Sequence, residues 1–189
     1  AAPHVLRREV FREAFSGEAA DPRALVERAF DIYRDRPLVG EVHGSAVAWW
    51  SYGQCGCSAR ALAAQLPDDG SVAIHGRNSL GWLVADWACA FKKAPSITVD
   101  ASVPPADAWA IANADHALTC ALVDHVEAWR ALDQNLSVMP LAARHETPKP
   151  FARRTCDVVT CLLTLGSTGA PKPLWFSAKD WADWCGASV

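Results

Sequence analysis

The chain has 189 residues, of which 51% are hydrophobic and 21% are charged, and its formal net charge is -3. This composition describes a globular protein long enough to bury a sizeable core, not a disordered chain. The small negative charge gives no electrostatic reason to expect nucleic-acid binding, and no apolar run is long enough to cross a membrane.

Residues 1–20 predict a helical extension before the main domain. Apolar residues recur at helical spacing between Val5 and Phe15. Such a helix could dock on another protein, lie at a membrane interface or cover its own domain, although Glu9 and Glu13 weaken the membrane alternative. The chain does not begin with Met and is rich in arginine near its start, so we expect a processed, mitochondrial protein.

Residues 21–140 predict an α/β core. Its first helix spans residues 21–35, with Asp21 as the N-cap. A strand over residues 47–52 and a helix over residues 53–66 come next.

Short apolar strands and amphipathic helices then alternate: strands at residues 71–75, 96–99, 117–123 and 137–140, and helices at residues 79–93, 105–114 and 124–132. Asn78 or Ser79 is expected to cap the first of these helices, and Asp124 the last. Parallel neighbouring strands need helical crossovers, so this alternation predicts an α/β fold with a mostly parallel sheet and helices on both faces.

Residues 141–155 have the proline-rich, polar character of a linker. The last segment, residues 156–189, begins with the apolar strand 158–163. A loop, a second strand over residues 174–177 and a terminal helix over residues 178–184 are predicted after it. The chain is therefore divided into an extension, a core, a linker and this C-terminal segment.

The loop after the apolar strand has the residue types of a phosphate site. Gly166 and Gly169 allow backbone conformations in which amide N–H groups converge on an anion. Ser167 and Thr168 add hydroxyl donors, and Lys172 adds a compact positive charge. The alternative is a simple Gly/Ser turn between two strands.

This loop resembles the phosphate-binding loop of the adenylate-forming superfamily, which includes acyl-CoA synthetases, luciferases and peptide-synthetase adenylation domains. The residues that match are Gly166, Ser167, Thr168, Gly169, Pro171 and Lys172, whereas Leu165 and Pro173 depart from the pattern. Residues 30–40, 50–66 and 72–99 are similar to upstream segments of the same superfamily. The resemblance covers roughly residues 25–177 and implies the N-terminal part of an ATP-dependent carboxylate-activating enzyme.

In that superfamily the other functional groups follow the loop: an adenine-contacting aromatic segment, a magnesium-associated Glu, a ribose-binding Asp and a Lys on a mobile C-terminal domain. The acid-binding pocket also lies downstream. Residues 178–189 cannot hold these motifs, so no catalytic residue is assigned. We expect a non-catalytic accessory subunit of a larger complex that needs no cofactor. The alternatives are a fragment of an ATP-dependent acid–thiol ligase completed by another chain, or a module that still binds ATP, AMP or acyl-CoA.

The remaining reactive residues form no second site. The seven cysteines are irregularly spaced and Cys55-Gly-Cys57 has no matching pair, so free thiols in a reducing, intracellular compartment are expected rather than a metal site. The six histidines are scattered, with no pair at metal-ligand spacing. Nine tryptophans are many for this length, and we expect some to contact protein partners.

Overall fold

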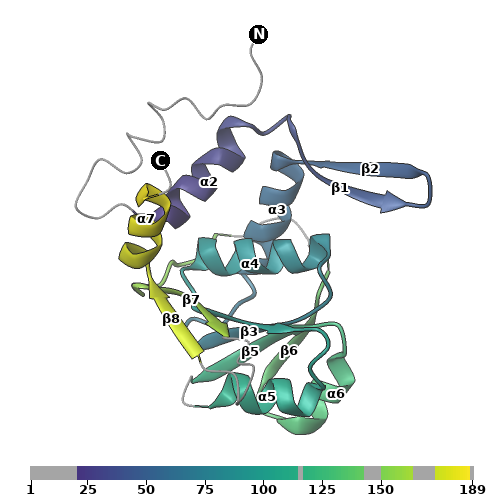
Figure 1. Ribbon diagram of the computed structural model, residues 1–189, viewed down its shortest axis with the longest axis vertical. Helices are drawn as coiled ribbons and strands as arrows, with labels where there is room; N and C mark the ends of the chain where they lie inside the picture. The colour runs from purple at the N-terminus through teal and green to yellow at the C-terminus, as the bar shows by residue number, and fades with distance from the viewer. Residues whose placement is uncertain (1–20, 115–116, 143–149, 164–172, 188–189) are drawn as a thin grey trace.

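The computed structural model describes residues 21–114, 117–142, 150–163 and 173–187. Within these ranges the chain forms a six-stranded sheet, a separate two-stranded hairpin, and helices on both faces of the larger sheet (Figure 1). The predicted α/β class, with a mostly parallel sheet, is confirmed. The N-terminal extension falls outside the described residues, and its predicted helix stays a prediction, as does the division of the chain into segments.

The large sheet has the strand order β6-β5-β3-β4-β7-β8. Its strands are β3 (Ser71–Gly76), β4 (Ser96–Asp100), β5 (Leu118–Val123), β6 (Ser137–Pro140), β7 (Val158–Leu163) and β8 (Pro173–Ser177). All neighbouring pairs are parallel except β7 and β8. The strands predicted from apolar runs are all present, with ends shifted by one residue or so.

Each face of the sheet has its own hydrophobic core. On the upper face in Figure 1 lie α2 (Pro22–Ile32), α3 (Tyr52–Ala63) and α4 (Leu80–Lys92), and on the lower face lie α5 (Pro105–Asn113) and α6 (Val126–Leu132). Successive strand side chains point to opposite faces. Ile74 therefore packs in the core that includes α3 and α4, while Ala73 packs in the core that includes α5 and α6.

Several helix starts follow local capping chemistry, whereas α5 and α6 have no side-chain cap among the described residues. Asp21 accepts a hydrogen bond from the Arg23 amide and Ser79 accepts one from the Trp82 amide, as N-caps do. The predicted cap at Asp124 is wrong: α6 begins after His125, and neither residue caps it through a side chain. The Asp124 carboxylate instead accepts a hydrogen bond from the Arg77 amide at 2.8 Å, which links the ends of β5 and β3.

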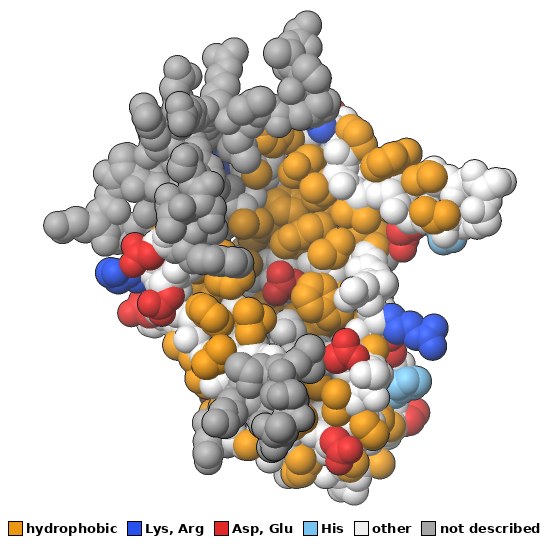
Figure 2. Space-filling model, viewed as in Figure 1, with side chains coloured by type: hydrophobic (Ala, Val, Ile, Leu, Met, Phe, Trp, Pro, Cys, Tyr) orange, Lys and Arg blue, Asp and Glu red, His pale blue; other side chains and the backbone are white. Residues whose placement is uncertain are grey.

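A hairpin of β1 (Pro37–His43) and β2 (Ala46–Ser51) extends away from the large sheet (Figure 1). Gly44 has φ +63 in its tight turn, a conformation that favours glycine. Three large apolar side chains on the hairpin are exposed: Val42 (72%), Val47 (47%) and Trp49 (63%). Figure 2 shows hydrophobic side chains across the middle of the face between this hairpin and the lower part of the molecule. Trp129, by contrast, is fully buried.

The C-terminal helix α7 (Ala178–Ala187) follows β8 and lies beside α2 (Figure 1). None of the helices in the described ranges is long and apolar enough to cross a membrane. The six cysteines among the described residues are free thiols. Four of them are buried: Cys55, Cys89, Cys120 and Cys161.

Candidate functional site

The phosphate-type loop joins β7 to the edge strand β8. Gly166, Ser167, Thr168, Gly169 and Lys172 all lie outside the described residues. Their attachment points are described: Leu163 ends β7 and is in register with Pro173, the first residue of β8. Both ends of the motif therefore meet at the carboxyl end of a parallel strand, which is the edge where open α/β sheets bind ligands.

Side-chain hydrogen bonds join β7 to its neighbour β4. The Ser96 hydroxyl donates to Thr160 Oγ1 at 3.0 Å, and the Thr160 hydroxyl donates to the Ser96 carbonyl at 3.3 Å. Both residues are buried. Because β7 is in register with β4 only at Ser96–Thr160 and Ile97–Cys161 among the described residues, these polar contacts are a large part of its attachment.

An arginine from the start of α2 holds the other end of β7. Arg23 is only 5% exposed, and its guanidinium donates to the carbonyls of Cys156 at 2.9 Å and Val158 at 3.4 Å. It also donates to both carboxylate oxygens of Asp21, and Lys93 lies 3.0 Å from the same carboxylate. Burial alone would raise the pKa of Asp21, but the hydrogen bonds from Arg23 and Lys93 lower it to about 2. The carboxylate therefore stays charged and keeps Arg23 directed at β7.

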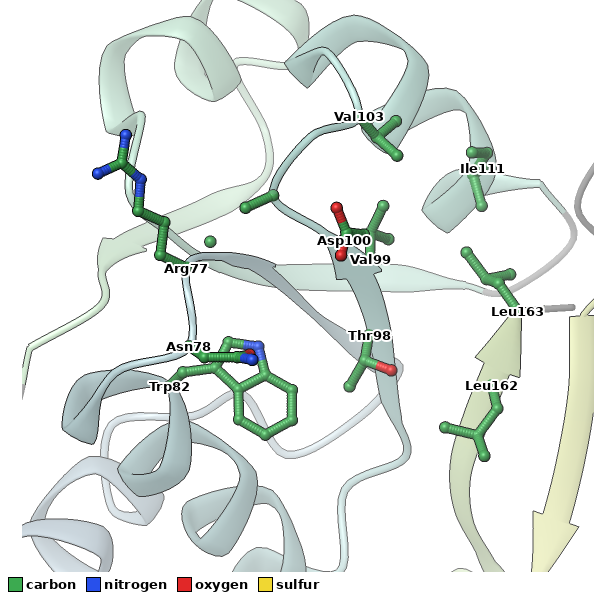
Figure 3. A pocket seen from close by; sticks show the side chains of 12 residues that line it. Arg77, Asn78, Trp82, Thr98, Val99, Asp100, Val103, Ile111, Leu162 and Leu163 are labelled. Carbon is green, nitrogen blue, oxygen red and sulfur yellow. The ribbon is translucent and has the colours of Figure 1, made fainter. Parts of the chain in front are cut away.

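A pocket of about 590 Å³ opens at the carboxyl ends of β3, β4 and β7 (Figure 3). The chain leaves β3 toward α4 on one face of the sheet and leaves β4 toward α5 on the other (Figure 1). Connections that part in this way leave a crevice between the two strand ends, where α/β proteins commonly bind ligands. The last described residues of β7, Leu162 and Leu163, line the pocket, so it adjoins the start of the loop.

The pocket has apolar walls and a polar rim. Trp82, Val103 and Leu162 surround the hollow, with Thr98 and Asp100 beside them, while the Arg77 side chain is directed away from it (Figure 3). The side-chain and backbone hydrogen bonds from Ser102 lower the pKa of Asp100, so this carboxylate is charged at neutral pH. The described lining contains no cysteine, lysine or histidine, and its polar side chains are those of Arg77, Asn78, Thr98 and Asp100, besides the Trp82 indole.

These pocket residues are not brought together by any pattern in the sequence. The available signal was positional: Arg77 and Asn78 follow one predicted strand and Asp100 follows the next, and the carboxyl ends of parallel strands share an edge. Leu162 lies in the predicted strand before the loop. Within the described ranges, no group of three or more His, Cys, Asp or Glu side chains is placed to hold a metal ion.

No protein-family model matches the sequence, and no curated protein matches it. Solved structures do share its fold. The fatty acyl-adenylate ligase from L. pneumophila, in complex with acyl adenylate and pyrophosphate, aligns with a TM-score of 0.73 and 16% identity over 96% of this chain. The A-PCP didomain of carboxylic acid reductase from Segniliparus rugosus, in complex with AMP, aligns with a TM-score of 0.65 and 17% identity over 95% of this chain.

A third structure, O-succinylbenzoate coenzyme A synthetase from Bacillus subtilis in complex with AMP, aligns with a TM-score of 0.59 and 12% identity over 80% of this chain. The present chain spans 33%, 35% and 41% of the three aligned chains, respectively. The predicted resemblance to the N-terminal part of adenylate-forming enzymes is thus confirmed for the fold.

Proposed function

We propose that this chain is the N-terminal part of an ATP-dependent adenylate-forming ligase, and that its residues 164–172 bind the triphosphate. The observation that carries the proposal is the place of the loop: a Gly/Ser/Thr/Lys motif joins β7 to β8 in a sheet with the fold of adenylate-forming enzymes. The comparisons support this hypothesis better than the accessory-subunit hypothesis, since the aligned proteins include ligases bound to AMP or to acyl adenylate.

In the proposed reaction a substrate carboxylate oxygen attacks the α-phosphorus of ATP. The new carboxyl–phosphate bond forms as the bond from the α-phosphorus to the bridging oxygen breaks, and pyrophosphate leaves with that electron pair. Negative charge grows on the departing phosphates, so backbone N–H groups and a cation placed there favour the transition state. The loop amides and Lys172 would supply these groups.

The described part of the chain contributes the frame rather than the acid-binding site. Arg23, Thr160 and Ser96 hold β7, and thus the first attachment point of the loop, to the rest of the domain. The acid pocket and the other reacting groups would come from the remainder of a ligase fold, on this polypeptide or on another.

The accessory-subunit hypothesis, with a mitochondrial complex as its setting, stays a second candidate because apolar side chains are exposed on the hairpin. Val42 and Trp49 are more exposed than an apolar residue usually is, and such surfaces commonly contact proteins. On this hypothesis the loop is vestigial and Lys172 has no role.

Calorimetric titration of the chain with ATP and AMP separates the two candidates. The ligase hypothesis predicts micromolar binding that weakens by about tenfold or more in Lys172→Ala, as expected for loss of one charge-assisted contact. Lys179→Ala is the control, because Lys179 is exposed on α7 and pairs with Asp183. Absence of binding, or equal binding by wild type and Lys172→Ala, contradicts the ligase hypothesis.

A further inference from the structure

A buried histidine lies immediately beside the pocket. His75, in β3, is 2% exposed, and the next residue, Gly76, lines the pocket. Both ring nitrogens of His75 have partners: Nδ1 is 3.1 Å from Trp129 Nε1, and Nε2 is 2.9 Å from the Val103 carbonyl oxygen. Trp129 comes from α6 and Val103 from the connection between β4 and α5. One side chain therefore joins three elements.

The two partners determine where the ring proton lies. An indole N–H can only donate, so Nδ1 of His75 must accept and carries no proton. A carbonyl oxygen can only accept, so Nε2 must carry the proton and donate it to Val103. His75 is thus a neutral imidazole in a single tautomer, and Trp129 selects that tautomer.

The bond to Val103 holds a turn that forms one wall of the pocket. The Val103 amide donates to the Asp100 carbonyl at 3.0 Å, and the Ser102 amide and hydroxyl both donate to the Asp100 carboxylate. These contacts close the turn on itself, whereas the His75 bond ties it to β3. The helix that follows has no side-chain cap, since its N-cap is Pro104. Asp100 and Val103 both line the pocket, so the position of the turn shapes it.

We infer that His75 is a positioning residue: its neutral, Trp129-held tautomer donates from Nε2 to the Val103 carbonyl and so keeps the Asp100–Val103 turn in place as a pocket wall. A second ring proton would sit on Nδ1 and face the Trp129 N–H, so the Trp129 contact would be lost, whereas Nε2 would still carry its proton toward Val103. This inference concerns the pocket beside the proposed phosphate loop. It rests on the proposed function only for the kind of ligand that this pocket binds.

Charged and titratable groups lie around the His75 ring on two neighbouring segments. Asp100 faces it from β4, and Asp124 and His125 face it from the connection between β5 and α6. Burial lowers the pKa of His75 and repulsion from His125 adds to this, while the Val103 bond and the Asp124 charge oppose the shift. The lowered pKa therefore favours the neutral ring to a lower pH than in an ordinary histidine.

Nuclear magnetic resonance of the imidazole nitrogens in the intact chain tests the tautomer and its titration. In the wild type, His75 is expected to show one protonated nitrogen, Nε2, over the pH range in which an ordinary histidine gains a second proton. In Trp129→Phe the ring keeps an aromatic neighbour but loses the donor to Nδ1, so its titration should move to higher pH. Protonation of wild-type His75 with an ordinary midpoint, or no change in the variant, overturns the inference.

Amide hydrogen exchange tests the effect on the turn. In His75→Leu, which cannot donate to the Val103 carbonyl, the Ser102 and Val103 amides should lose at least about tenfold of their protection at neutral pH. The amides of β5 should keep theirs. A turn that exchanges at the same rate in the wild type and the variant, or a uniform loss over the sheet, overturns the inference.

A pair of His75 variants separates loss of the hydrogen bond from loss of the imidazole ring. His75→Gln keeps a donor for the Val103 carbonyl and should retain most protection of the turn, whereas His75→Leu cannot donate and should lose it. Equal protection in the two variants overturns the inference. Should His75→Leu not fold, the Trp129→Phe titration decides alone. None of these measurements uses a nucleotide, so absence of ATP binding would count against the proposed function and leave this inference standing.

Discussion

The central strands and the β7–β8 pair differ in how they are held. All of β3 is buried, and it is in register with β4 from Val72 to Gly76 and with β5 on its other side. The first part of β8 is exposed, and β7 meets β4 over a short stretch. The most diagnostic sequence motif therefore joins the less buried strands, where a few polar contacts replace extensive burial. The stability of the domain and its proposed chemistry belong to different regions.

The largest difference between the regions should come from truncating matched apolar residues. Ile74 in β3 is fully buried in the core on the α3 and α4 side, so Ile74→Ala should lower the free energy of unfolding by about 2–5 kcal/mol. Leu174 in β8 is 49% exposed, so Leu174→Ala should cost no more than about 0.5 kcal/mol. Urea denaturation of both variants measures the two changes, and similar losses would contradict the comparison.

Removal of Arg23 should weaken the attachment of the β7–β8 pair through loss of hydrogen bonds. Arg23→Met leaves the carbonyls of Cys156 and Val158 and the Asp21 carboxylate without their main donor, at a cost of about 2–3 kcal/mol. Hydrogen exchange should show the β7 amides opening before those of β3. Arg130→Met is the control, since Arg130 pairs with Glu127 on the surface of α6 and its loss should change stability by less than about 0.5 kcal/mol.

The contact between Asp21 and Arg23 should also make the free energy of unfolding depend on pH. The pKa of Asp21 is about 2 in the folded protein and 3.8 in its ordinary environment, so the unfolded chain takes up this proton first as pH falls. The stabilisation is complete above pH 4 and disappears toward pH 2. Arg23→Met should show a shallower decline over that window, and an unchanged decline would contradict the assignment.

A partly buried carboxyl group in the central region predicts the opposite pH dependence. Asp86 lies on α4, and desolvation raises its pKa to about 6. Above pH 4 the unfolded chain loses this proton more readily, so the wild type loses stability as pH rises through 6. Asp86→Asn should remove that loss and stabilise the protein by about 1–2 kcal/mol at pH 7. Thermal denaturation at pH 4 and pH 7 measures the change. Asp107→Asn, at an exposed site on α5, is the control at both pH values.

The smallest expected effect concerns the link between β4 and β7. Thr160→Val keeps the shape of the side chain but removes both hydrogen bonds with Ser96, at a cost of about 1 kcal/mol. Thr98→Val makes the same change in β4 at the pocket, and a cost below about 0.5 kcal/mol is expected there. If the two variants denature at the same urea concentration, the Ser96–Thr160 link does not stabilise the strand pair.

Much of the local structure could be predicted from the sequence. Apolar runs marked the strands, Asp21 and Ser79 marked helix starts, and the alternation of strand and helix indicated a mostly parallel sheet. These features depend on chain conformation over a few residues, which local sequence specifies well. The wrong prediction of a cap at Asp124 shows where local prediction fails. The Asp124 carboxylate accepts a hydrogen bond from the Arg77 amide, which is distant in the sequence.

The sequence by itself determined the order and type of the elements apart from β1, and it placed the phosphate-type motif after an apolar strand. Only the tertiary structure decided that β3 lies between β4 and β5, that Arg23 reaches the Cys156 carbonyl, and that Trp129 selects the tautomer of His75. These partners are far apart in the chain, and their contacts depend on how the sheet and both layers of helices pack together. No short-range pattern encodes such contacts, because each one exists only when several elements are already in place.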